Sequence, residues 1–142
     1  MPVILRLLAI ALLALPTIAT AQSTEAPAGI SLELNAVEDV EGACRFTFVA
    51  HNETSQAIDK AVFETVIFDA EGAVVRLALF DFRELPDGRL RVRQFDVSGM
   101  NCNAISQALI NGTNSCVIDG VQSTVCSDGL SLSSRITIKL LG

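Results

Sequence analysis

From residue 30 onward the chain is a series of short apolar segments separated by turn-forming residues, which limits it to an all-β fold. No window keeps the helical period of about 3.6 residues for the length of an ordinary helix. Residues that favour turns occur at 69–72, 86–88, 98–99 and 111–112. The segments between turns predict seven strands, at 30–37, 44–51, 57–68, 73–82, 89–97, 104–110 and 135–141. This number and spacing of strands predicts a two-sheet sandwich.

The first 21 residues have the order of a secretory signal peptide. Arg6 precedes an apolar run from Leu7 to Leu15, and Ala19-Thr20-Ala21 has the small-residue pattern of a cleavage site. The apolar run is shorter than the roughly 20 residues that a membrane span needs. We therefore expect cleavage after Ala21, no membrane span in the mature chain, and a location in the periplasm or outside the cell.

Cleavage after Ala21 leaves 121 of the 142 residues, enough for one domain. Residues 22–29 contain Ser, Thr, Pro and Gly without periodicity and predict a flexible N-terminus, whereas 30–142 predict a single domain. The mature part has nine Lys and Arg against 16 Asp and Glu, a net charge of −7. This charge argues against nucleic acid or an anionic membrane surface as the main partner.

The chain has four cysteines, all in the predicted mature part: Cys44, Cys102, Cys116 and Cys126. An even number of cysteines in an exported chain predicts two disulfides. Zinc is the alternative, but there is no Cys-x-x-Cys pair and only His51 is available as a further nitrogen ligand. We therefore expect no metal and no cofactor.

The strand at 44–51 shows which side of the sheet the core lies on. Cys44, Phe46, Phe48 and Ala50 alternate with more polar residues, so they belong to the buried face.

The strand at 89–97 carries alternating arginines. Arg89, Arg91 and Arg93 lie on one face, and Leu90 and Val92 on the other, so we expect the arginines to be solvated. Guanidinium groups in a row suit an acidic partner or a carboxylated ligand. They are also a common means of keeping a sheet soluble and its edge unpaired, and both interpretations stay open.

Several short motifs resemble those of a known class of domain: Phe46-Thr-Phe48, the turn Asn52-Glu-Thr54, Val66-Ile-Phe68-Asp69 and Leu85-Pro-Asp-Gly88. From Leu32 to about Ile110 their order resembles the FxLYD-type and related immunoglobulin-like domains of bacterial envelope proteins. The whole precursor also resembles short exported proteins of alphaproteobacteria. The resemblance implies an immunoglobulin-like β-sandwich in a bacterial periplasm, without a catalytic residue.

The immunoglobulin-like architecture bears on the cysteine pairing, for which four cysteines allow three possibilities. Its second and sixth strands run the same way in opposite sheets, and Cys44 and Cys102 lie near the starts of these strands. This favours a Cys44–Cys102 disulfide. Cys116 and Cys126 would then close a loop over Asp119-Gly120, and a Cys102–Cys116 bond would contradict the assignment.

The chain lacks a recognisable catalytic set. Nucleophilic catalysis of the Ser/His/Asp or Cys/His kind needs a positioned base, and His51 is the only histidine. His51 lies at the outward end of a strand, which is typical of a surface residue, so we expect no enzymatic activity.

Two groups of acidic residues admit a binding role or a structural one. Glu38-Asp39-Val40-Glu41 has enough carboxylates for a calcium ion but lacks the further oxygen ligands of a calcium loop, so a solvated turn is the simpler interpretation. Asp81 and Asp96 lie beside phenylalanines and predict structural ion pairs with Arg83 or Arg93.

The sequence therefore predicts a non-catalytic interaction module that binds a protein of the cell envelope through an exposed sheet edge or the arginine-bearing face. A secreted hydrolase inhibitor that presents the loop 116–126 is the alternative, because a closed loop loses little entropy on binding. A structural protein of the envelope is a further alternative.

Overall fold

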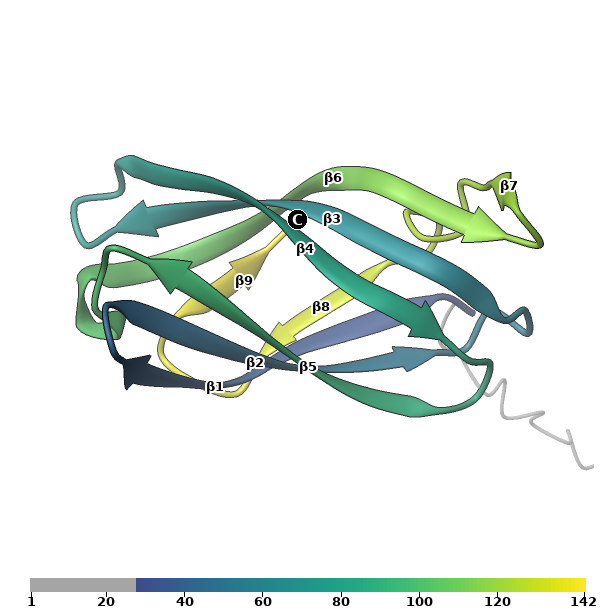
Figure 1. The fold of residues 1–142 in the computed structure, drawn as a ribbon, viewed down its shortest axis with the longest axis horizontal. Coiled ribbons are helices and arrows are strands. Elements are labelled where there is room, and N and C mark those ends of the chain that lie inside the picture. The colour runs from purple at the N-terminus through teal and green to yellow at the C-terminus, as the bar shows by residue number, and fades with distance from the viewer. Residues whose placement is uncertain (1–27) are drawn as a thin grey trace, which may run out of the picture.

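The computed structural model describes residues 28–142, which form two β-sheets around one core (Figure 1). The predicted signal peptide 1–21 and residues 22–27 lie outside the described residues. The elements are β1 (Ile30–Val40), β2 (Ala43–Asn52), β3 (Ile58–Asp69), β4 (Val74–Leu85), β5 (Leu90–Ser98), the 3₁₀ turn η1 (Cys102–Ala104), β6 (Ile105–Ile118), β7 (Val121–Gln122), β8 (Ser131–Ser134) and β9 (Lys139–Leu141). No helix in the described part of the chain is long and apolar enough to cross a membrane.

The first sheet has the order β5-β2-β1-β8, and the second has β4-β3-β6, with β7 and β9 both paired to β6. The pairs β1–β8 and β6–β9 are parallel, and the others are antiparallel. The order leaves β5 at the end of the first sheet and β4 at the end of the second. These terminal strands follow each other in the chain and run side by side across the front of the molecule in Figure 1.

Residues 28–142 contain nine strands rather than the seven that the sequence predicts for this part of the chain. The largest difference is in β6, which continues to Ile118 through Asn111 and Gly112, where a turn was predicted. Gly112 pairs with Glu64 and Ile110 with Thr65, so Asn111 is the extra residue of a bulge. The turn-forming pair Asn-Gly therefore bends a strand here instead of ending it.

The predicted strand 135–141 is also wrong in its extent, because two short strands, β8 and β9, are separated by residues 135–138. The Ser134 hydroxyl donates hydrogen bonds to the carbonyl oxygens of Ile138 at 2.6 Å and Ile136 at 3.3 Å. Serine hydroxyls that bond to nearby backbone favour turns over strands. The chain thereby passes from the first sheet to the second.

The core has an aromatic centre. Cys44, Phe46, Phe48 and Ala50 are fully buried, as the alternation in β2 predicts. The Phe48 ring lies 5.4 Å from that of Phe82, edge to face. Such pairs are favourable beyond the area they bury.

Two glycines, Gly29 just before β1 and Gly129 just before β8, lie in close contact. A Cβ atom on Gly29 would clash with the carbonyl oxygen of Gly129, so a side chain at this position would force the backbone apart. Gly29 also accepts a hydrogen bond from the N–H of Glu53 at 2.9 Å. This contact places β8 alongside β1, where the two strands pair in parallel.

Candidate functional site

The most distinctive surface lies where the free edges of β4 and β5 face each other (Figure 1). Phe80 of β4 and Phe95 of β5 stack with ring centroids 4.3 Å apart and close the gap between the two sheets. Phe82 packs against the same Phe95 ring at 5.0 Å. The two edges are thus held together by side chains, and their backbones do not pair.

Arg93 ties β5 to the edge of β4. Its guanidinium donates hydrogen bonds to the carbonyl oxygens of Phe82 at 2.6 Å and Glu84 at 3.1 Å, and to the Glu84 carboxylate at 3.3 Å. Only 16% of the Arg93 side chain is exposed. Arg93 therefore has an internal structural role, and the prediction that it is solvated is wrong.

The predicted arginine face does not exist as one surface. In β5 the side chains of Arg91 and Arg93 share the inward face with Phe95 and Val97, while Leu90 and Val92 are 62% and 58% exposed. The register explains this, because Phe95 lies opposite Phe46 and the period of two then turns Arg93 toward Phe48.

Of the other predicted arginines, Arg91 is half-buried, and its guanidinium donates to the carbonyl oxygen of its neighbour Leu90. Arg89 precedes the strand, in the turn where its N–H donates to Pro86. Of the three predicted arginines, Arg89 alone is exposed.

The outer face of β4 is apolar and exposed. Val75, Leu77 and Leu79, which we call the β4 ridge, are 41%, 61% and 57% exposed. The ridge continues inward onto the central strand β3 through Val66, which pairs with Leu77 and is almost fully buried. Long apolar edge strands are unusual in soluble proteins because they invite pairing with another chain.

A shallow groove of about 540 Å³ runs between the two edges. Its walls include Leu79 and Arg83 from β4 and Val92 and Phe95 from β5. Arg83 adopts a left-handed backbone conformation with φ of 60°, and its N–H donates to the Asp81 carboxylate. Phe82 is the extra residue of a β-bulge at this point of the β3–β4 register, and the Arg83 side chain is exposed.

The arginines impose a positive field on this part of an acidic protein. The pKa of the Glu84 carboxyl lies below its usual value, chiefly because the Glu84 backbone N–H bonds to it, with further lowering by Arg93, Arg91 and Arg83. Between residues 74 and 93 five arginines occur with only three acidic residues. The β4 and β5 edges are therefore the part of the surface where the acidic excess is reversed.

The remaining predicted residues have structural contacts. Asp96 forms a bidentate ion pair with its cross-strand neighbour Arg45, at 2.7 and 2.9 Å. The sequence predicted Arg83 or Arg93 as the partner of Asp96 instead. This hydrogen bonding to Arg45 lowers the pKa of the Asp96 carboxyl. The Asp39 carboxylate accepts the Cys102 N–H at 2.7 Å, and the Nδ1 atom of His51 lies 3.6 Å from Glu53.

Within residues 28–142 no three His, Cys, Asp or Glu side chains gather as they would around a metal ion. Of the acidic residues in 38–41, Glu38 and Asp39 belong to the end of β1, and Glu41 lies in the turn that leads to β2.

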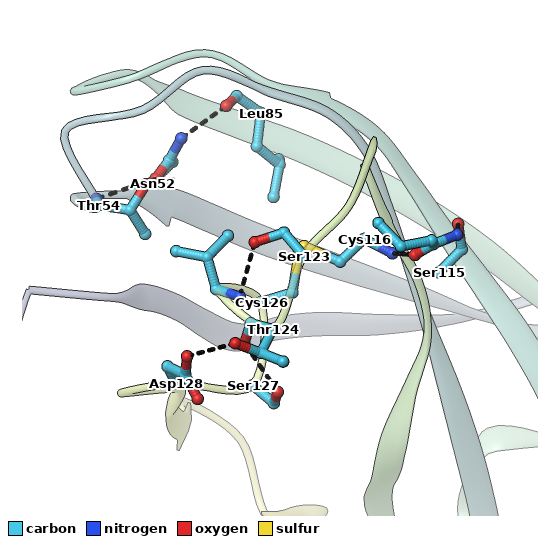
Figure 2. Close-up of a disulfide and its surroundings, with 12 residues drawn as sticks. Asn52, Thr54, Leu85, Ser115, Cys116, Ser123, Thr124, Cys126, Ser127 and Asp128 are labelled. Atoms are coloured by element: carbon cyan, nitrogen blue, oxygen red, sulfur yellow. Dashed lines mark hydrogen bonds between the residues drawn. A yellow bond between two sulfur atoms is a disulfide. The ribbon is translucent and has the colours of Figure 1, made fainter. Parts of the chain in front are cut away.

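The disulfides are Cys44–Cys102 and Cys116–Cys126, the pairs that the sequence favours. Figure 2 shows the second bond, between β6 and the segment that follows β7. Beyond it, β6 and β7 form a hairpin whose tip is Asp119 and Gly120, with φ of 50° and 75°. This is the geometry of a tight two-residue hairpin turn, and the next residue, Val121, is 67% exposed.

One structurally important residue was not identified from the sequence. Asn52 is fully buried, and its amide nitrogen donates to the carbonyl oxygens of Gln56 and Leu85, each at 2.7 Å. Figure 2 shows the bond to Leu85. Its amide oxygen accepts the N–H and the hydroxyl of Thr54 at 3.0 and 2.7 Å. The motif Asn52-Glu-Thr54 predicts a local turn, but the long-range bond to Leu85 has no signal in the sequence.

Comparison of the chain with protein-family models, curated proteins and solved structures found no match. The two buried disulfides are typical of proteins of oxidising, extracytoplasmic compartments.

Proposed function

We propose that this protein is a non-catalytic interaction module of the periplasm or the cell exterior, with an immunoglobulin-like sandwich that binds a polypeptide at the β4 edge. The exported location rests on the signal-peptide pattern of residues 1–21 and agrees with two disulfides. The immunoglobulin-like assignment rests on the FxLYD-like motifs and on the order β5-β2-β1 facing β4-β3-β6.

The observation that carries the binding role is the β4 ridge on a strand that pairs with β3 on one side and has a free edge on the other. An exposed sheet edge binds an extended segment by main-chain hydrogen bonds, while alternate side chains supply specificity. The ridge supplies apolar contacts at Val75, Leu77 and Leu79. The free edge of β5 is less suited to strand addition, because Arg91 and Arg93 point inward beside it and inward-pointing charges oppose edge pairing.

Charging the ridge is expected to abolish binding. A variant with Leu77→Lys and Leu79→Lys should give about tenfold fewer protein adducts than the wild type, which corresponds to a loss of about 1.4 kcal/mol in binding free energy. Both side chains are exposed, so the substitutions leave the core intact, and lysines on an edge strand oppose pairing. The measurement is crosslinking in intact cells followed by mass spectrometry of the adducts.

The matched control carries Leu90→Lys and Val92→Lys, which are equally exposed apolar residues on the other edge strand. It should keep the wild-type adducts. Equal yields in the ridge variant and the wild type would contradict the proposal, as would equal losses in the ridge variant and the control.

A hydrolase inhibitor remains the second candidate because the β6–β7 hairpin projects at one end of the molecule (Figure 1). The Cys116–Cys126 bond holds its base, and the Cys116 N–H is bonded to the Gln122 side chain at 3.2 Å. A rigid loop with an exposed apolar residue directly after its tip, Val121, suits insertion into a substrate cleft.

If this second candidate is correct, the purified protein inhibits at least one enzyme in a broad hydrolase panel. Val121→Asp should then raise the inhibition constant at least about tenfold. Val74→Asp is the matched control, because Val74 is also exposed but lies on β4. Absence of inhibition throughout the panel would remove this candidate and leave the edge-binding function unaffected.

A further inference from the structure

We infer that the strand bound at the β4 edge is β4 of a second copy of this chain, paired antiparallel with Leu77 on the two-fold axis. This rests on the proposed use of the β4 edge for strand addition and names its partner. The extent of the free edge, its side-chain pattern and its charges support the inference independently.

The free stretch of β4 is centred on Leu77. Arg93 occupies the carbonyl oxygens of Phe82 and Glu84, so an added strand cannot bond to that end of β4. The strand begins at Val74. The stretch that remains, residues 74–80, has Leu77 at its middle, and an antiparallel pair that uses all of it places Leu77 opposite its own copy.

The direction of the backbone groups is compatible with this register. The Phe82 carbonyl points to the open edge, where Arg93 reaches it. Backbone groups alternate sides along a strand, so residues 76, 78 and 80 also point outward to the open edge. Leu77 then forms a non-hydrogen-bonded pair with its copy, in which Cα atoms lie about 4.5 Å apart and side chains pack closely.

The β4 ridge is complementary to itself in this register. Leu77 meets Leu77 on the exposed outer face of the joined sheets, and Val75, the extra residue where the β3–β4 register shifts, lies near Leu79 of the other copy. The contact uses the same surface on both copies, so it closes as a dimer. The β5 edge, with its inward-facing arginines, does not extend the assembly further.

The charges also fit a second copy. In this register Arg83 of each copy lies at the turn that contains Glu71 of the other copy. Among residues 28–142, neither Arg83 nor Glu71 forms an ion pair within its own chain. Arg76 lies opposite Ala78, and its guanidinium reaches toward Gly99 of its own chain. No like charges face each other directly. The region 74–93, with five arginines and three acidic residues, is also where two acidic copies repel least.

The test is sedimentation velocity over a concentration series, with disulfide-bonded protein purified from the periplasm of an expression host. The wild type should show a reversible dimer. Leu77→Lys should abolish it, because two lysines would face each other on the axis and like charges opposed in an interface are strongly unfavourable. Leu90→Lys is the matched control and should dimerise like the wild type, because Leu90 is equally exposed but lies on β5.

Two further variants test the register. Arg83→Glu and Glu71→Arg should each raise the dimer dissociation constant about tenfold, and the double variant should restore it. Leu77→Cys should form a symmetrical intermolecular disulfide under mild oxidation, because the expected Cα separation of about 4.5 Å suits one. Leu90→Cys should not form one.

A wild type that is monomeric at every soluble concentration overturns the inference, as does a dimer that Leu77→Lys leaves intact. The proposed function fails separately. If the protein is monomeric but the ridge variant still loses its adducts in cells, the edge binds a different polypeptide and only the identity of the partner is wrong. If the ridge variant also keeps its adducts, both proposals are contradicted.

Discussion

Replacing both Cys44 and Cys102 with alanine is expected to lower the free energy of unfolding by about 4 kcal/mol. The bond joins residues 58 apart in sequence, so without it the unfolded chain gains the entropy of a long open loop. It also fixes the start of β2 to the segment that leads into β6, and thereby joins the two sheets at one end. Urea unfolding at constant m-value measures the loss.

The matched variant replaces Cys116 and Cys126, whose bond spans only 10 residues, and it should lose about 3 kcal/mol. All four cysteines are at least partly buried, so the cavities left by alanine are comparable and loop length is the main difference. A larger loss for the short loop than for the long one would contradict this account. The difference would then lie in the native contacts of the β6–β7 hairpin.

Asn52→Ala is expected to lower the free energy of unfolding by at least about 3 kcal/mol. The side chain is fully buried, and its removal breaks four hydrogen bonds and leaves the buried Leu85 carbonyl oxygen without this donor, whereas the Gln56 carbonyl oxygen keeps the Thr54 hydroxyl at 3.1 Å. Each buried polar group left without a partner costs about 1 to 3 kcal/mol. The end of β2, the end of β4 and the turn between β2 and β3 would all lose a shared contact.

Two variants separate this effect from the loss of any asparagine. Asn111→Ala should cost less than about 1 kcal/mol, because Asn111 is exposed and bonds only to the Glu64 carboxylate. Asn52→Asp retains an acceptor for Thr54 but removes both donors and places a carboxylate beside two carbonyl oxygens, so it should be nearly as harmful as alanine. A tolerated Asn52→Asp would show that the amide donors matter little.

The all-β class and the burial of one face of β2 could be predicted because each depends on local patterns. Phe46 and Phe48 alternate with polar residues over a single strand, and that period determines which side faces the core. The cysteine pairs, one of which joins residues 58 apart, were favoured by the strand directions of the immunoglobulin-like architecture that the resemblance implies. The turn after Asp69 has its signal within a few residues, and the Asp69 carboxylate accepts the N–H groups of Glu71 and Ala73.

The candidate site could not be predicted in the same way, because alternation separates the two faces of a strand without showing which face is buried. In β5 both sets were plausible, Leu90 and Val92 on one side and Arg91 and Arg93 on the other. Phe95 determines which face of β5 is buried, because it stacks on Phe80 of the other sheet. Leu77 and Leu79 on β4 are likewise exposed because the sheet order gives β4 a neighbour, β3, on one side only.

By itself the sequence determined the class of fold, the face of β2 that is buried, the acidic net charge of the chain and the pairing of its four cysteines in disulfides. Local periods and turn residues are sufficient for these properties, because they act over a few positions of the chain. Only the tertiary structure decided that Arg93 is an internal tie between two strands, that Asn52 joins β2 to β4, and that the apolar ridge of β4 is open. These depend on which strands become neighbours, and strand order is set by packing between residues far apart in sequence.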